Sequence, residues 1–483
     1  MILLNHLPAL QILIVFFGAL FTIITNKNSA RFIAIISITI SLGLGSYCFE
    51  QIRQDNFASI YYHFGNFKAP IGIEYILDSL NQPLIIYINS VLLFLLLFCN
   101  SLVDRNILKY ISIKRQNLFY SVLLFAHTGY IGIMSTNDIF NLYVFIEIAS
   151  LSSYVLVSQG NHKQAAIGAF DYLILGTIGT TLILIAIGFL LEFTGSLNMS
   201  DIKERLHGHY DSKIVITGIS FFLIGSILKT AFFPMHFWMI RSYLSAPTII
   251  LVYIAGISSV IGIYILLRFI HFTIEYNEII YGLSKFLMPV TSCTMILCSL
   301  LALKAETVKK IAIYSCTTQI GYVFLLSIIP GTQAILLQFL LADSVNKVGL
   351  FFIISHIEAI GDYRLLAQHK IHCFLIASLL ICSSALPISK MFIIKLNILD
   401  LLIKKDLWHN FVIIMISSSI SLLYHYKIAT HLFWSQKTLS IELTDAQYVQ
   451  DKTSDNIQIQ LSIDSMLYGL IFLIAIQLTL LFF

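Results

Sequence analysis

The sequence predicts an all-α polytopic membrane protein with about 14 transmembrane helices. Of its 483 residues, 58% are hydrophobic and only 11% are charged, and the mean hydropathy is +0.87. A soluble domain of this length needs far more charge on its surface. The apolar stretches also recur at roughly the 20-residue length with which a helix crosses a bilayer. Composition and spacing together exclude a soluble protein.

The predicted helices follow one another with short connections. They begin near residues 8, 31, 80, 117, 138, 165, 214, 246, 284, 309, 333, 371, 408 and 463. The first apolar run has no basic segment before it and is longer than the core of a typical signal peptide, which favours a retained helix. Four polar stretches are all short enough to be loops: residues 50–75, 101–116, 197–213 and 435–460.

Four segments organise the chain. Residues 1–116 hold helices 1–3, residues 117–271 the first five-helix repeat, residues 284–434 the second, and residues 435–483 a polar loop and helix 14. A block of five helices makes the next block enter the membrane from the opposite side, so we expect helices 4–8 and 9–13 to form an inverted repeat. Pro234 and Pro387 predict that helices 7 and 12 are broken.

The charges of the loops predict the orientation. The odd-numbered loops carry about 15 Lys and Arg residues and the even-numbered loops about 8. Because cytoplasmic loops are enriched in these residues, we expect the odd loops in the cytoplasm. Both termini then lie on the outer side of a cell (inner) membrane, which the chain crosses many times.

The sequence contains no motif for a cofactor or a metal. Its seven cysteines are scattered through apolar segments without the spacing of a metal site or a disulfide framework. It has no glycine-rich phosphate loop, Walker motif or haem-type histidine pair. We therefore expect no catalytic residues and no redox chemistry on this chain. An ion gradient or a partner subunit would supply the energy for any work it does.

Buried charges are the candidate functional residues. A lysine at membrane depth costs roughly 2.5–3.5 kcal/mol on insertion scales, so its presence indicates a function. Lys229 lies in the run ILKTAFFPMHFW and Glu147 in the run NLYVFIEIASLSSYVLV, each among apolar residues. A carboxylate that gains and loses a lysine partner changes its proton affinity, which can drive proton movement. The alternative is a static ion pair that fixes helix packing.

Two further lysines, an aspartate and a histidine extend this set. Asp343 and Lys347 are four residues apart, so they share a helix face and can pair along it. Lys395 has no carboxylate near it in the sequence, and is either a terminal proton site or a lysine that reaches the interface. His236 either relays protons or hydrogen bonds to the carbonyl that Pro234 frees.

Four ordered motifs resemble the antiporter-like family, which includes the large membrane subunits of respiratory complex I and of Mrp-type cation/proton antiporters. NLYVFIEIASLSSYVL is similar to the family's fifth helix, whose glutamate falls on Glu147, and KTAFFPMHFW places the seventh-helix lysine on Lys229. VKKIAIYSCTTQIGY is similar to the family's K-R-x-x-A-Y-S-S-x-x-Q-x-G-Y. SALPISKMFIIK places the twelfth-helix lysine on Lys395. The likeness spans residues 75–400 without large gaps.

The sequence departs from this family pattern near the centre of the chain. The eighth-helix lysine falls on Val260, and the eleventh-helix histidine falls on Asp343. The resemblance implies a proton path from the Glu–Lys pair through the eighth-helix lysine towards Lys395, so Val260 removes a titratable group from its middle. Either Asp343 compensates by titrating with Lys347, or the chain is a divergent paralogue.

The resemblance implies a proton- and cation-translocating membrane subunit of a multisubunit Mrp-like cation/proton antiporter. GSLNMSDIKERL, residues 195–206, is most similar to the D subunit of such antiporters. One alternative is a proton-pumping subunit of an NADH–quinone oxidoreductase of the complex I type, which would make the chain part of an enzyme. Another is a structural paralogue that moves no ions. The expected partners are other membrane subunits, the lipid bilayer, protons and Na⁺ as a candidate cation, with no nucleic acid.

Overall fold

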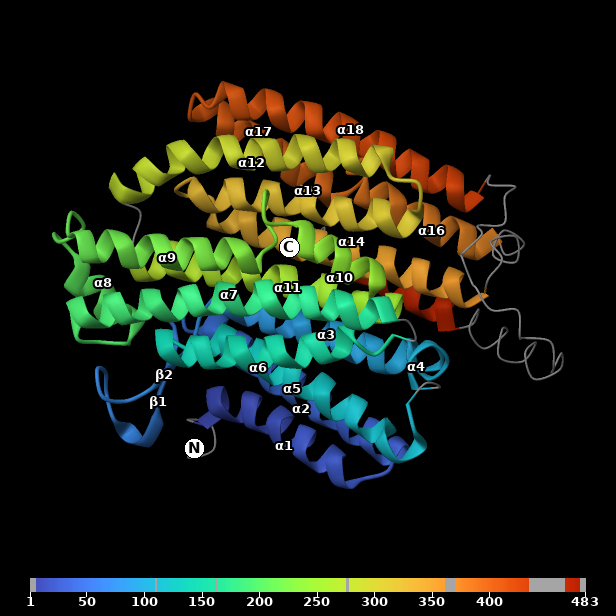
Figure 1. Ribbon diagram of the computed structural model, residues 1–483, viewed down its shortest axis with the longest axis horizontal. Coiled ribbons are helices and arrows are strands. Elements are labelled where there is room, and N and C mark those ends of the chain that lie inside the picture. Colours follow the sequence, from blue (N-terminus) through green and yellow to red (C-terminus); the bar gives the residue numbers. More distant parts are fainter. Residues whose placement is uncertain are drawn as a thin grey trace.

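The computed structural model confirms a helical membrane-protein fold. It describes residues 6–108, 111–160, 163–274, 278–360, 370–433 and 465–477. Within these ranges, eleven helices are long and apolar enough to cross a membrane, and they lie side by side along the long dimension of the molecule (Figure 1). Their bounds are α1 Leu7–Ile24, α2 Lys27–Gln54, α3 Asn81–Phe98, α5 Gln116–Ser135, α6 Ile139–Val157, α7 Lys163–Thr194, α11 Thr248–Leu267, α12 Glu278–Lys304, α13 Val308–Ile328, α14 Gln333–Ile360 and α18 Trp408–Phe433.

Two further helices are interrupted. Helix α9, Lys213–Lys229, is followed by α10, Phe237–Ser245, and α16, Lys370–Ser383, is followed by α17, Lys390–Lys404. A short apolar helix covers Ser465–Gln477. Most of these helices begin within a few residues of the starts expected from the sequence, and both expected breaks are present. The polar loop expected at 435–460 lies outside the described residues.

The two breaks are built alike. Each first half-helix is followed, two residues after its end, by an alanine with positive φ: Ala231 at 54° and Ala385 at 59°. The next backbone N–H donates to the carbonyl five residues earlier, over 3.4 Å from Phe232 to Ile227 and over 3.3 Å from Leu386 to Ile381. This is the Schellman pattern, which satisfies the last carbonyls of a helix. Proline follows within three residues in both breaks, where it cannot continue the first helix.

Three of the stretches expected to be loops contain regular structure, so that expectation is wrong in part. Strand β1, Ile60–His63, pairs antiparallel with β2, Glu74–Leu77, and α8 covers Met199–Leu206. Short helical segments complete the described part: α4 Asn100–Asn106, η2 Phe64–Asn66, η4 Ile113–Arg115 and η5 Arg268–Ile274. These elements are too short for sequence periodicity to reveal, and distant contacts stabilise them. For example, Asn198 caps α8 and donates to Glu74 Oε2 at 2.6 Å.

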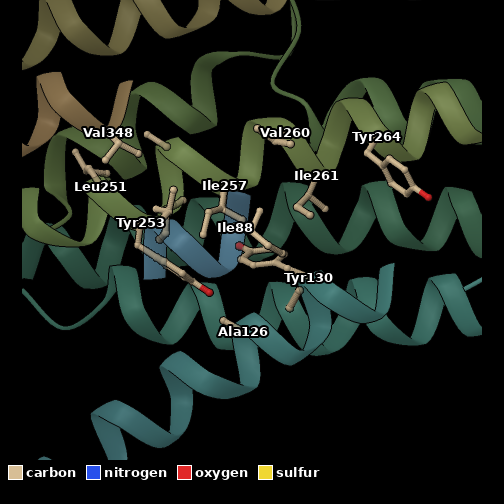
Figure 2. Close-up of a cluster of buried hydrophobic side chains, with 14 of the residues drawn as sticks. Ile88, Ala126, Tyr130, Leu251, Tyr253, Ile257, Val260, Ile261, Tyr264 and Val348 are labelled. Atoms are coloured by element: carbon tan, nitrogen blue, oxygen red, sulfur yellow. The ribbon is translucent and has the colours of Figure 1, made fainter. Parts of the chain in front are cut away.

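Helix α11 lies at the centre of the bundle. It contacts helices from both ends of the sequence, including α3, α5, α9, α13 and α14. In lipid, such contacts are stabilised by close van der Waals packing rather than by removal from water. Figure 2 shows this packing around α11, with the labelled neighbours Ile88 of α3, Ala126 and Tyr130 of α5, and Val348 of α14. The charged residues of interest lie on helices around this centre.

Candidate functional site

Lys229 is the last residue of α9, at the first break. Its Nζ donates to Ser150 Oγ at 2.7 Å and to the Tyr154 hydroxyl at 3.4 Å, and it lies 5.9 Å from the centroid of the Tyr154 ring. Both hydroxyls belong to α6. Glu147 of the same helix is half-buried and interacts electrostatically with Lys229, but the two charged groups are not within the 4.0 Å of a direct ion pair. Hydroxyl groups, rather than the carboxylate, therefore contact the ammonium.

Asp343 and Lys347 form the buried ion pair that their spacing predicts. Lys347 Nζ lies 2.6 Å from Asp343 Oδ2, and each side chain is 6% exposed. Removing one partner of such a pair leaves an uncompensated charge and typically costs about 3–5 kcal/mol. Lys347 also donates to Ser259 Oγ of α11 at 3.4 Å. The pair on α14 is thereby connected to the central helix.

Lys395 lies in α17, just after the second break. It is 6% exposed, and its Nζ has no hydrogen-bond partner in the described structure. The ammonium lies 5.0 Å from the ring centroid of Tyr322, a cation–π contact, and interacts electrostatically with Asp343. This geometry places Lys395 in the protein interior and not at the membrane surface.

His236 lies within the first break, before α10. It is 2% exposed, its ring is stacked on Phe237 with centroids 4.5 Å apart, and it interacts with the backbone of Pro234. It is not in an ion pair in the described structure. Its Nδ1 is buried and has no hydrogen-bond partner in the described structure. Trp238 does bind the backbone at this break, because its Nε1 donates to the carbonyl of Leu228 at 3.0 Å.

Val260 lies in α11, between the two groups of charges. It is 1% exposed and belongs to the central apolar packing, where Figure 2 labels it beside Ile261. The structure therefore provides no titratable side chain at this position. The neighbouring Ser258 and Ser259 are the polar residues of this part of the helix.

Sequence reasoning missed the hydroxyls that contact Lys229. Ser150 and Tyr154 follow Glu147 by three and seven residues, a spacing that places all three on one helix face. That spacing is the signal that could have found them. Ion pairs were also missed, among them Arg268 with Asp78, at 2.5 Å, and Arg241 with Asp171, at 3.6 Å. Their partners are far apart in the sequence, so no local pattern indicates either pair.

The described residues contain no group of three or more His, Cys, Asp or Glu side chains placed to hold a metal ion. The seven cysteines are free, and four of them are buried. The groups that the site contains are carboxylate, ammonium and hydroxyl groups, which can hold and transfer protons. These groups run from α6 and α9, past α11, to α14 and α17.

The fold is that of a polytopic membrane subunit built from many apolar helices. The family described as "NADH:quinone oxidoreductase/Mrp antiporter, TM" matches residues 136–421, more than half of the chain. The chain therefore belongs to this family of membrane subunits. The match includes Glu147, Lys229, Asp343, Lys347 and Lys395.

Curated relatives come from both branches of this family. The chain is 28% identical to the NADH-quinone oxidoreductase subunit N of Desulforudis audaxviator, over 72% of this chain and 69% of that protein. It is 29% identical to the "Putative antiporter subunit mnhD2" of Staphylococcus epidermidis, over 74% of this chain and 70% of that protein. Both are named as subunits.

Solved structures share the whole fold. One is a chain of the membrane-bound sulfane sulfur reductase, an archaeal respiratory membrane complex, with a TM-score of 0.79 and 20% identity over 98% of this chain and 96% of that one. Another belongs to the Mrp complex of Dietzia sp. DQ12-45-1b, with a TM-score of 0.78 and 18% identity over 99% of this chain and 97% of that one. These likenesses extend the shared fold beyond residues 136–421.

Proposed function

We propose that this chain is a proton- and cation-translocating subunit of a multisubunit Mrp-like cation/proton antiporter. One observation carries the proposal: Lys347 and Lys395 are buried and Lys229 is half-buried within the helix bundle, and of these three lysines only Lys347 directly contacts a carboxylate. A lysine kept in a membrane interior without an acid partner is costly and marks ion pathways. Protons can then pass between Glu147 with Lys229 at one end and Asp343, Lys347 and Lys395 at the other.

The two breaks support an internal repeat. We propose that residues 117–271 and 284–434 are inverted five-helix repeats, with residues 1–116 and 435–483 outside them. Figure 1 shows the α9–α10 and α16–α17 pairs running in opposite directions, and both breaks have the same Schellman geometry. In transporters, half-helix ends of this kind line ion sites at the repeat interface. Lys229 precedes its break, whereas Lys395 follows its break. The proposed repeat therefore superposes the backbones of the two breaks but does not place the two lysines at equivalent positions.

The second candidate is a proton-pumping subunit of a complex I-type NADH–quinone oxidoreductase, favoured by the similarity to a subunit N. The similarity of residues 195–206 to the antiporter D subunit favours the Mrp-like assignment. In either case, the partners are other membrane subunits of the same complex. The subunits that co-purify with the chain distinguish the two: small membrane subunits support the antiporter, and peripheral flavin and iron–sulfur subunits support the oxidoreductase.

The test of translocation uses inverted vesicles from cells that express the complete complex. A dye that reports the pH gradient measures proton release on addition of Na⁺ or another cation. We expect Glu147→Gln and Lys229→Ala each to abolish exchange, because the first removes the carboxylate charge and the second removes the ammonium group. Co-purification of the other subunits is expected to show that the complex still assembles. Wild-type exchange in both variants would overturn the mechanism. Lys285→Ala, on α12 near its start, is the control for loss of a lysine outside the path.

A further inference from the structure

The central helix α11 has a half-buried stretch, Ser258 and Ser259, next to the position where the family lysine is missing; we call this stretch the opening. Every residue from Thr248 to Leu267 is buried except Ser258 and Ser259, which are partly exposed. Helix α11 packs against α3, α5, α9, α13 and α14, so these two serines interrupt an otherwise enclosed helix. A void lined by hydroxyl groups can hold water, whereas an apolar void of the same size stays dry.

Hydroxyl groups lead from Lys229 to this opening. Lys229 contacts the hydroxyl of Tyr154, whose ring packs edge-on against Tyr172 with centroids 4.6 Å apart. Tyr172 is fixed by stacking on Trp238, with centroids 4.4 Å apart and planes 13° from parallel. The Tyr172 hydroxyl in turn interacts with Ser258. Tyr154 and Tyr172 are 4% and 6% exposed, so this route lies inside the protein.

Hydroxyl groups also lead from the opening to the second group of charges. Ser258 interacts with the hydroxyl of Tyr243 as well. Ser259, the next residue, accepts a hydrogen bond from Lys347 at 3.4 Å, and Lys347 is paired with Asp343. The two serines are therefore the residues of α11 that connect the Lys229 end with the Asp343–Lys347 end.

From this geometry we infer that Tyr154, Tyr172, Ser258 and Ser259, with water between them, replace the missing lysine as the central proton relay. The inference rests on the proposed function. A proton leaves Lys229 Nζ, each hydroxyl oxygen accepts one proton as it passes its own onward, and one proton arrives at Lys347 Nζ or the Asp343 carboxylate. No relay group ends the step with a changed charge, and nothing is oxidised or reduced. Val260 remains a packing residue.

The test measures proton flux in inverted vesicles that contain the complete complex. We expect the double variant Ser258→Ala/Ser259→Ala to lower the flux about tenfold, equivalent to about 1.4 kcal/mol in the barrier. The variant Ser258→Thr/Ser259→Thr, which keeps both hydroxyls, is expected to retain the flux. Adding Val260→Lys to the double-alanine variant is expected to restore it, because a lysine then fills the same gap. Ser299→Ala is the control: this buried hydroxyl donates to Ile296 of its own helix at 2.8 Å.

The possible results separate this inference from the function on which it rests. Wild-type flux in the double-alanine variant, with Glu147→Gln inactive in parallel vesicles, would overturn the relay and leave the proposed function intact. Loss of flux in the threonine variant together with no recovery by Val260→Lys would also overturn it, because the serines would then matter only for packing. Wild-type flux in Glu147→Gln would overturn both. If protons pass through the hydroxyls, the flux of the wild type is expected to be slower in D₂O than in H₂O. Loss of this isotope effect in the double-alanine variant would support the relay.

Discussion

The glycine at position 176 sets the place of the Tyr154 hydroxyl beside Lys229. A Cβ atom at Gly176 would lie 1.9 Å from this hydroxyl oxygen, far closer than two unbonded atoms approach. The ring carbon Cζ would lie 2.9 Å away as well, and this ring is buried against Tyr172. An added methyl group would therefore displace Tyr154. The absence of a side chain on α7 is what allows the 3.4 Å contact between Tyr154 and Lys229.

We predict that Gly176→Ala lowers ion exchange several-fold, because it displaces a relay hydroxyl, and destabilises the complex by about 1–3 kcal/mol, because the added methyl group overpacks a buried contact. Gly188→Ala, on the same helix, is the matched control, since no atom lies within 4 Å of its added Cβ. It is expected to leave exchange unchanged and to be neutral or slightly stabilising, by about 0.5–1 kcal/mol. Exchange assays and thermal unfolding of the purified complex measure both effects. Equal exchange in the two variants would contradict the prediction.

The charged residues could be predicted from the sequence, and most of their hydroxyl partners could not. Glu147, Lys229 and Lys395 stand out because a charge in an apolar run is costly. Serine and tyrosine are ordinary packing residues of membrane helices, so Tyr172 and Ser258 carry no such signal. The distance between Glu147 and Lys229 also depends on how α6 and α9 pack, which the sequence does not state.

The helix breaks show what a sequence predicts at the scale of elements. Pro234 and Pro387 indicate where a helix cannot continue, and both breaks are found there. The alanines that carry the positive φ angles are not predictable, because glycine is the usual residue at such a position. The β1–β2 hairpin is unpredictable for another reason: strands of four residues show too little alternation.

We predict that Ala385→Gly leaves the complex as stable as the wild type or more stable. A non-glycine residue in the left-handed region costs roughly 1–2 kcal/mol, which glycine avoids, although glycine also loses more entropy on folding. The same exchange at Ala377, inside α16, is expected to destabilise by about 1 kcal/mol. Thermal unfolding of the two purified complexes gives the comparison. A larger loss of stability from Ala385→Gly than from Ala377→Gly would show that its φ angle is not a source of strain.

For the whole molecule, the number and order of the helices could be predicted because the thickness of the bilayer fixes their length. The orientation follows only from loop charge. In Figure 1, the β1–β2 hairpin and α8 lie at one end of the bundle, and α4 lies at the other. The expected orientation places the hairpin end outside the cell and the α4 end in the cytoplasm.

We predict that a cysteine at Lys68, in the hairpin, reacts with a membrane-impermeant maleimide in intact cells. A cysteine at Lys114, between α4 and α5, is expected to react only after the membrane is opened. Both side chains are exposed. The wild-type chain is the control for its native cysteines, of which Cys48, Cys99, Cys298 and Cys316 are buried. The opposite pattern of labelling would reverse the orientation.

The opening at Ser258 and Ser259 has a consequence for leakage across the membrane. A lysine carries its own hydration shell and keeps its surroundings wet. Two hydroxyls beside Val260 and Ile257 hold water weakly, and narrow apolar passages can close by dewetting. We therefore expect water beside the two serines to be lost and regained readily, and its loss to interrupt the proposed relay between Lys229 and Lys347 without any helix having to move.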